Sequence, residues 1–552
     1  MIKQRILNIL NQTLEHCRER GLLQMPVDFE PQVEVPKKEA HGDFATTVAL
    51  TLAGANRRSP REVAAALVEQ MGDGGGLFSR VEVAGPGFIN LSISPAAWYD
   101  ILPEIHAQDQ TYGRVNIGKG RYVQVEFVSA NPTGPLHIGH GRGAATGDVL
   151  ARILEATGHR VQREYYINDV GTQMDTLGRS VFLRYQQLLG RNLEFPATCY
   201  QGDYIRDLAR EMQELHGDSY RDTPETEAVP AFTRHAADRI LAGIREDLDL
   251  FGVHHDEWFS ERSLYESGAV DRTIAMLKAA GHLFDKDGAL WFRSTAFGDE
   301  KDRVVVRANG LTTYFASDLA YHQNKFERGF DLVINLWGAD HHGYVARMQA
   351  GVMALGRKPN SLKLLLVQLV NLLRKGKPVA MSTRAGEFET LRAVLDEVGR
   401  DAARFIFLTR RSDSPLDFDL ELAKEKTAEN PVYYVQYGHA RICSVMRLAE
   451  ERRLALDGSD LSRLNLPEEM ALIKELSLFP EVVENSARFL EPHRITYYLT
   501  QLASTFHSYY NHHRLIQEDT DLARARLYLA LAVRIVLRNG LELLGVSALE
   551  KM

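Results

Sequence analysis

Two histidines three positions apart, His137 and His140, are the side chains of this 552-residue sequence whose spacing most suggests chemistry. They follow a turn rich in proline and glycine at 131–135, and small residues at helical spacing come next. Side chains three apart at the beginning of a helix lie on one face. The unpaired backbone N–H groups there can bind phosphate. Both imidazoles could therefore donate hydrogen bonds to phosphate oxygens as charge develops in a transition state.

A metal-binding pair or an ordinary surface pair has the same spacing, so the surrounding residues must decide. The alternating apolar run at 123–128 predicts a buried strand directly before the turn. Pro135 precedes the pair and Gly139 lies within it. A strand, a glycine-rich turn and a helix in this order favour a phosphate site over a metal pair.

A second polar group, Asp340, His341 and His342, follows an apolar strand expected at 331–337, after Gly338 and Ala339. These residues could border a nucleotide at the strand's end, or they could form a metal cluster. No third ligand at suitable spacing supports the metal, so no metal site is predicted.

The elements that must position these groups indicate a doubly wound, Rossmann-type α/β domain over residues 111–425. The expected strand at 123–128, a helix ending near Gly158 and a strand at 161–166 have the order of a parallel sheet, which binds ligands at the carboxyl ends of its strands. Residues from about 170 to 300 read as a mostly helical insertion. A strand at 363–370 is expected to be the last of the sheet.

Residues 1–110 predict a small α/β domain. Apolar residues at helical spacing indicate a first helix, and Ser59 followed by Pro60 marks the beginning of another. The runs at 81–83 and 88–93 predict a strand pair around a glycine-proline-glycine turn.

Residues 426–552 predict an all-helical domain. Tyr433, Tyr437 and Arg441 are four apart and share one helix face, and Tyr509 and Arg514 repeat the theme. Residues 430–552 contain 14 Lys and Arg against 15 Asp and Glu, so RNA binding here would need stacking aromatics and arginines gathered on one face. A helical bundle with tyrosines in its core has the same spacing, and that alternative stays open.

The composition is that of a globular chain, with 45% hydrophobic and 25% charged residues and a net charge of −8. This balance excludes a uniformly basic nucleic-acid binder but not a local basic patch. No apolar run of 18 residues predicts a membrane span. Three distant cysteines indicate neither a disulfide framework nor a zinc knuckle, which fits a reducing cytoplasm.

The segment EFVSANPTGPLHIGH at 126–140 resembles the HIGH signature of class I aminoacyl-tRNA synthetases, and in particular of bacterial arginyl-tRNA synthetases. Further patches resemble the same family: HGDFATTVAL at 41–50, YFASD at 314–318, the segments 430–442 and 505–514, and the ending LLGVSALEKM. The resemblance implies an N-terminal domain that contacts the tRNA elbow, a catalytic domain and a helical anticodon-binding domain.

This resemblance implies that the chain activates arginine with ATP and Mg²⁺ and transfers it to the terminal adenosine of tRNA(Arg), with activation dependent on that tRNA. It implies a monomer in the cytoplasm. The ATP-binding residues would be His137, Gly139, His140, Asp340, His341, Met381 and Ser382. The arginine-binding residues would be Glu126, Ser129, Asn131, Tyr314 and Asp318. The tRNA-binding residues would be Tyr433, Tyr437, Arg441, Tyr509 and Arg514.

The chain departs from the family pattern at the second class I signature, K-M-S-K-S. The matching loop reads AMSTR at 380–384, so both lysines are absent, and Gly134 occupies the place where some arginyl enzymes carry a compensating lysine. The always-charged Arg384 is expected to act as the missing catalytic cation, with Lys375 and Lys377 near it in sequence.

Two other readings remain at this point. A nucleotidyl-transfer enzyme for small molecules could carry the same histidine signature, although such chains are usually short and lack a long helical tail. A non-catalytic tRNA-binding paralogue is the third reading, because the signature lysines are missing.

Overall fold

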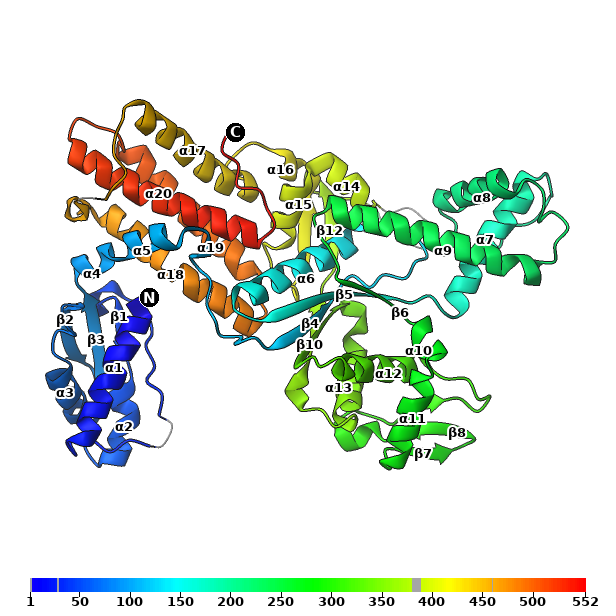
Figure 1. Cartoon of the computed structure of the whole chain (residues 1–552), viewed down its shortest axis with the longest axis horizontal. Coiled ribbons are helices and arrows are strands. Elements are labelled where there is room, and N and C mark those ends of the chain that lie inside the picture. Colours follow the sequence, from blue (N-terminus) through cyan, green and yellow to red (C-terminus); the bar gives the residue numbers. More distant parts are fainter. Residues whose placement is uncertain (1, 27–28, 380–388, 459) are drawn as a thin grey trace.

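A five-stranded parallel sheet in the order β11-β10-β4-β5-β6 lies at the centre of the molecule (Figure 1). The structure is a computed structural model that describes residues 2–26, 29–379, 389–458 and 460–552. The strands are β4 (Tyr122–Glu126), β5 (Arg160–Ile167), β6 (Glu257–Ser260), β10 (Leu332–Gly338) and β11 (Leu362–Val367). The chain proceeds from β4 outward to β6, and then from β10 outward to β11, so the winding reverses between β4 and β10. This order confirms the doubly wound fold and places a binding crevice at that reversal.

Helices cover both faces of the sheet. In Figure 1, α6 (Ile138–Ala156) lies above it, and α12 (Tyr314–Glu327) and α13 (Val345–Ala354) lie below. Glycine allows α6 to approach the sheet closely, because a Cβ atom at Gly147 would lie 2.2 Å from Cγ of Phe127. The helix ends two residues before Gly158, where the sequence predicted its end.

Two excursions leave the sheet between β5 and α12. The first is the arm of α7 (Thr172–Leu188), α8 (Asp203–His216) and α9 (Glu225–Leu250). The second contains α10 (Arg262–Glu266), α11 (Ala269–Ala279), β7 (Leu283–Lys286), β8 (Ala289–Phe292) and β9 (Arg303–Val306). Strand β6 separates them and pairs with β5, so the stretch read as one insertion from about 170 to 300 is divided by a strand of the main sheet.

The strand expected at 363–370 ends earlier, and this corrects the prediction. Strand β11 stops at Val367, and a second strand from Val370 to Arg374 joins a separate three-stranded sheet. The chain turns between them because the Arg142 guanidinium binds the Gln368 carbonyl at 2.9 Å, while the Gln368 amide donates to Ser412. The elements of this region are β12 (Val370–Arg374), β13 (Lys377–Pro378), α14 (Leu391–Val398), α15 (Arg400–Phe407), β14 (Leu416–Asp419) and α16 (Leu420–Lys424).

The N-terminal unit packs helices on an antiparallel sheet of order β1-β3-β2. Its second long helix begins where the sequence indicated, because Ser59 caps it and Glu62 completes a capping box. The elements are α1 (Ile2–Glu19), β1 (Phe44–Thr46), α2 (Val48–Asn56), α3 (Pro60–Met71), β2 (Phe78–Ala84), β3 (Phe88–Ile93), α4 (Pro95–Tyr99) and α5 (Ile101–Gln108).

All the long elements of the C-terminal unit are helices, as predicted. Its helices are α17 (Pro431–Glu451), α18 (Pro467–Phe489), α19 (His493–His512) and α20 (Thr520–Leu543). Within the described ranges, no helix is both long enough and apolar enough to cross a membrane. The three cysteines are free thiols in the interior.

Candidate active site

The two histidines form the first turn of α6 and are held by backbone amides. His137 is the N-cap residue, and its Nδ1 accepts a hydrogen bond from the Gly139 amide at 3.1 Å. His140 Nδ1 accepts from the His137 amide at 3.2 Å. The imidazole rings stack with centroids 3.7 Å apart. Both rings are therefore fixed relative to the N-terminus of the helix.

These contacts define what the imidazoles can donate. Because each Nδ1 accepts a backbone N–H, a neutral ring must carry its proton on Nε2. Burial lowers the pKa of His137, and burial together with the neighbouring His137 lowers the pKa of His140 to about 3. The pair thus presents neutral Nε2–H donors at physiological pH.

Gly139 is required by the histidine ring itself. A Cβ atom at this position would lie 2.9 Å from Cε1 of His137, so a side chain would displace the ring. The family resemblance places Gly139 among the ATP-binding residues, and this contact gives the residue a further role.

The backbone after β4 is strained where it enters the signature turn. Val128 and Ser129 have φ values of 68° and 42°, and a β-branched residue rarely adopts such a conformation. Polar contacts hold the turn: Ser129 Oγ donates to Glu126 at 3.2 Å and accepts from the Tyr166 amide at 3.1 Å. Residues held in such conformations cluster at functional sites.

A cavity of about 450 Å³ opens beside this turn at the carboxyl ends of β4, β6 and β10. We call it the acidic cavity, because three carboxylates line it: Glu126, Glu261 and Asp318. Ser129 and Tyr314 also line it, and Tyr314 is 55% exposed at its rim. Four of the five predicted arginine-binding residues therefore border one cavity.

Glu126 differs from the other two acids because the protein already supplies its counter-charge. Its carboxylate accepts from Nζ of Lys325, which is fully buried and also donates to Asn335 Oδ1 at 2.9 Å. A carboxylate that binds a guanidinium must have negative charge available for it, and the charge of Glu126 is already paired with Lys325. This ion pair makes Glu126 less suited to binding the guanidinium directly. Its hydrogen bond from Ser129 favours a role in supporting the turn.

Asp318 and Glu261 provide the charge that faces the cavity. Burial raises the pKa of Asp318 to about 7, despite a hydrogen bond from the Tyr344 hydroxyl that opposes the shift. Burial likewise raises the pKa of Glu261, which receives hydrogen bonds from Ser317 and Tyr166. Among the described residues, neither carboxyl group forms an ion pair with a lysine or arginine, and two desolvated carboxyl groups of this kind fit a cationic ligand.

A second cavity of about 530 Å³ adjoins the histidines. We call it the histidine cavity; His137, His140 and Asn131 form one wall, and residues 197–202 with Tyr204 of the arm form the opposite wall. Asn131, the fifth predicted arginine-binding residue, thus lies on the histidine side. Gln173 lines both cavities.

Of the other residues predicted to bind ATP, Asp340 and His341 lie among the described residues. His341 borders the acidic cavity, while the side chain of Asp340 is 83% exposed and lies 3.7 Å from the His341 ring. Among the described residues, no group of three His, Cys, Asp or Glu could hold a metal ion. Met381, Ser382 and Arg384 lie outside the described residues.

Three of the predicted RNA-binding residues of the helical unit, Tyr433, Tyr437 and Arg441, lie together and are half-buried. Arg441 lies 4.6 Å from the ring centroids of both Tyr437 and Tyr510, and Tyr433 stacks on Tyr437. We call Tyr433, Tyr437, Arg441 and Tyr510 the aromatic cluster.

The position of Tyr509 corrects its predicted role. Its side chain is 1% exposed, and its hydroxyl donates to the buried Glu469, so it cannot stack on a base. The helical turn directs the adjacent Tyr510 toward Arg441 instead. The side chain of Arg514 is exposed at the end of α19.

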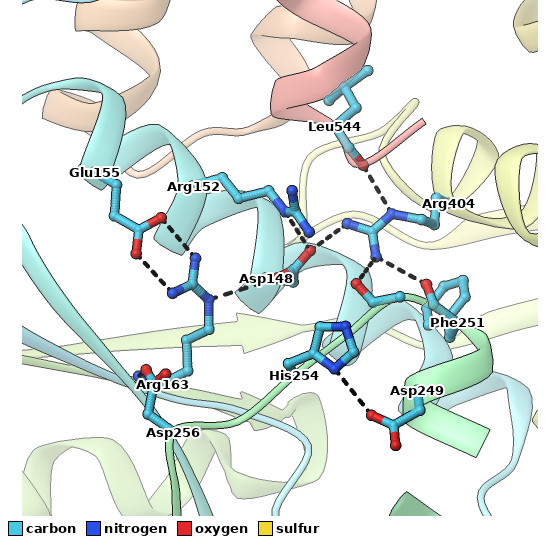
Figure 2. A network of polar contacts seen from close by, with 11 residues as sticks. Asp148, Arg152, Glu155, Arg163, Asp249, Phe251, His254, Asp256, Arg404 and Leu544 are labelled. Carbon is cyan, nitrogen blue, oxygen red and sulfur yellow. Dashed lines mark hydrogen bonds and ion pairs between the residues drawn. The ribbon is translucent and has the colours of Figure 1, made fainter. Parts of the chain in front are cut away.

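A buried polar network holds the far part of α6 (Figure 2). Asp148 accepts hydrogen bonds from Arg404 and from Arg152, and Arg163 lies 3.7 Å away. Arg404, fully buried, also donates to the carbonyls of Phe251 and Leu544 at 3.1 and 2.9 Å. One guanidinium thus joins the signature helix to the end of the arm and to the end of α20.

Two residues that line the acidic cavity, Glu261 and Gln173, were not predicted from the sequence. Glu261 directly follows β6, so the rule that ligands bind at strand ends could have found it. That signal was hidden because the four residues of β6 lie within a stretch read as a helical insertion. Gln173 has no comparable signal, since it lies in the first turn of an ordinary amphipathic helix.

The doubly wound sheet with its paired histidines at the switch point defines a nucleotide-binding enzyme of the class I synthetase type. Family models cover almost the whole chain: "Arginyl tRNA synthetase N terminal domain" matches residues 2–93, "tRNA synthetases class I (R), catalytic domain" matches 101–443, and "DALR anticodon binding domain" matches 435–552.

Full-length relatives agree with these matches. The chain is 57% identical to an arginine--tRNA ligase from Syntrophotalea carbinolica and 54% identical to one from Geobacter sp., each alignment covering 100% of both chains. The Thermus thermophilus arginyl-tRNA synthetase structure has the same fold, with a TM-score of 0.77, 22% identity and 100% coverage of both chains. The chain belongs to the arginyl-tRNA synthetase family.

Proposed function

We propose that this protein is an arginine–tRNA ligase. In the first step, a carboxylate oxygen of arginine attacks the α-phosphorus of ATP, a P–O bond forms, and the bond to the β-phosphate bridge breaks to release pyrophosphate. In the second step, a ribose hydroxyl of the terminal adenosine of tRNA(Arg) attacks the carbonyl carbon and loses its proton, and AMP leaves. Family membership and full-length similarity to arginine--tRNA ligases support this reaction.

The adjacency of a cavity lined by carboxyl groups and a cavity lined by neutral imidazoles is the observation that carries the proposal. Asp318 and Glu261 suit a planar cation with several N–H donors, which carboxylates bind in paired geometry. The Nε2–H groups of His137 and His140 suit phosphate oxygens. An amino acid with a guanidinium at one end and a carboxylate at the other fits this arrangement.

Neither chemical step requires a protein nucleophile. The protein's task is to align the reactants and to stabilise charge that spreads over the phosphates. Mg²⁺ enters as part of the nucleotide substrate, held mainly by phosphate oxygens and water. The predicted cation Arg384, with Met381 and Ser382, would act on the phosphates from the segment that matches the second class I signature, and this remains a prediction from sequence.

The accessory units supply the contacts with tRNA in this proposal. The N-terminal unit would contact the elbow, and the helical unit would read the anticodon through the aromatic cluster and Arg514. The arm of α7 to α9 forms one wall of the histidine cavity, so it would be close to the acceptor end.

An aminoacylation assay tests the function directly. The purified protein is incubated with MgATP and each labelled amino acid, with and without tRNA. We expect charging with arginine only, and we expect pyrophosphate exchange to depend on tRNA(Arg). Binding of tRNA without charging would select the non-catalytic paralogue, and adenylation of another small molecule without tRNA would select a different nucleotidyl-transfer enzyme.

A further inference from the structure

The acidic cavity and the histidine cavity share the side chain of Gln173, which is hydrogen bonded to Asn131 of the histidine cavity. Asn131 Nδ2 donates to Gln173 Oε1 at 2.7 Å. Asn131 comes from the turn before α6, and Gln173 comes from the first turn of α7 in the arm. Gln173 borders both cavities, so it lies where a ligand would pass from one to the other.

This pairing leaves each amide with one unused group. Among the described residues, the NH₂ group of Gln173 has no acceptor and the carbonyl oxygen of Asn131 has no donor. The pair therefore offers one donor and one acceptor toward a ligand at the crossing. An α-amino acid has the complementary groups, since its ammonium donates and its carboxylate accepts.

The reaction requires the substrate to place its two ends in different cavities. A guanidinium bound by Asp318 and Glu261 lies in the acidic cavity, while the carboxylate must reach phosphorus beside His137 and His140. The α-carbon end must then lie at the boundary, which Gln173 and Asn131 form.

We infer that Gln173 binds the α-carboxylate of arginine through its side-chain NH₂ group, and this inference rests on the proposed function. Asn131 receives the ammonium group beside it. Gln173 is thus a substrate-binding residue that holds the carboxylate at the entrance of the histidine cavity.

The backbone of Gln173 is held while its side chain remains exposed. Gly171, with φ of 92°, caps the helix, and its carbonyl accepts from the Met174 amide at 3.0 Å. The Met174 side chain is buried at 4% exposure and anchors this turn to the arm. A fixed backbone with an accessible amide is the arrangement expected of a residue that binds a ligand rather than stabilises the fold.

A comparison of arginine with agmatine tests the inference. Agmatine has the guanidinium and the amine of arginine but lacks the carboxylate. We would measure both dissociation constants by calorimetry on the full chain for wild type, Gln173→Ala and Gln173→Glu. Loss of a hydrogen bond to a charged group should weaken arginine binding about tenfold or more in Gln173→Ala and leave agmatine within about twofold. Gln173→Glu should weaken arginine further through charge repulsion.

The matched control is Gln187→Ala, which removes a glutamine from the same helix whose amide binds the Leu193 carbonyl outside both cavities. It should bind both ligands as wild type does. Equal weakening of arginine and agmatine in Gln173→Ala, or no weakening of either, would overturn the inference. If wild type charges tRNA with arginine in these cases, the proposed function stands without it. If wild type neither binds nor charges arginine, the proposed function falls and the inference falls with it.

Discussion

The neutral state of the signature histidines determines how they can act. A buried imidazolium at a helix N-terminus would be disfavoured both by desolvation and by the positive end of the helix dipole. Because Nδ1 of each ring accepts a backbone N–H, the proton of each neutral ring lies on Nε2. Such preorganised neutral donors stabilise developing phosphate charge without any proton transfer.

Replacement of His140 by alanine should therefore reduce tRNA-dependent pyrophosphate exchange by roughly 10²–10³, the usual cost of losing one preorganised donor. The pKa of His140, lowered by burial to about 3, implies that its contribution is constant from pH 6 to 8. His254→Ala, at an exposed histidine paired with Asp249, is the control and should retain wild-type exchange. An unchanged rate in His140→Ala would remove the histidine from the mechanism.

The carboxyl groups of the acidic cavity should make the binding of arginine depend on pH. Burial raises the pKa of Asp318 to about 7, so the free enzyme loses this charge as the pH falls through that value. A guanidinium binds the ionised form, and the arginine KM should therefore rise below about pH 7. Asp318→Asn should raise the arginine KM by about 10- to 100-fold, from loss of a charged hydrogen bond, and should flatten its pH profile.

Steady-state kinetics with arginine and ATP varied separately would check this prediction. The ATP KM in Asp318→Asn should remain within about twofold of wild type, because Asp318 is assigned to the guanidinium of arginine and not to the phosphates. Comparable increases in both KM values would place Asp318 outside the arginine pocket.

At the level of elements, α6 is held at its N-terminus and at its middle by different means. Its N-terminal turn is fixed by the two histidine caps, and its middle is fixed by the buried pair of Asp148 with Arg404 (Figure 2). Burial alone would raise the pKa of Asp148, but the charges of Arg404 and Arg152 outweigh it and hold the pKa below its usual value. The orientation of the signature therefore depends on a contact remote from the chemistry.

Asp148→Asn should lower the free energy of unfolding at pH 7 by about 3–5 kcal/mol, because it leaves a buried guanidinium without its counter-charge. A lowered native pKa stabilises the fold above the unfolded value of about 3.9, and that stabilisation is lost as the pH falls through the native pKa. The difference from wild type should therefore shrink below about pH 4. Urea unfolding at several pH values would measure it. Asp249→Asn, at an exposed ion pair, is the control and should change stability by less than about 1 kcal/mol.

Local patterns predicted the elements whose signals lie within a few residues of one another. The strand, turn and helix around His137, the capped helix at Ser59 and the helical C-terminal unit were all readable in this way. The identity of the family also came from short contiguous segments.

Contacts between distant residues could not be read from the sequence. Lys325 pairs with Glu126 across a separation of 199 positions, and no local signal in the sequence indicated this buried ion pair at a predicted arginine-binding residue. Glu261 is placed at the cavity by a strand of only four residues, which is too short to give a clear pattern in the sequence. Tyr509 and Tyr510 are adjacent, and only the packing of α19 decides which of them faces the core.

At the level of the whole molecule, the units are arranged around the sheet so that a large substrate can contact several at once. The helical unit and the N-terminal unit lie on one side of the sheet in Figure 1, and the arm extends on the other. The helical unit has no excess of positive charge, since residues 430–552 contain 14 basic and 15 acidic side chains. Stacking on aromatic side chains must therefore supply much of its affinity for RNA.

Tyr437 lies at the centre of the aromatic cluster, between Tyr433, His507 and Arg441. Tyr437→Ala should raise the tRNA KM by roughly 10- to 100-fold, because each base stacked on an aromatic ring contributes about 1–3 kcal/mol. Arginine affinity measured by calorimetry without tRNA should not change, since no residue of the cluster lines the acidic cavity or the histidine cavity. Tyr497→Ala, at an exposed tyrosine of the same unit outside the cluster, should leave the tRNA KM at its wild-type value. Equal effects of the two substitutions would show that the cluster has no special part in binding RNA, and tRNA recognition would have to be sought on another face of the helical unit.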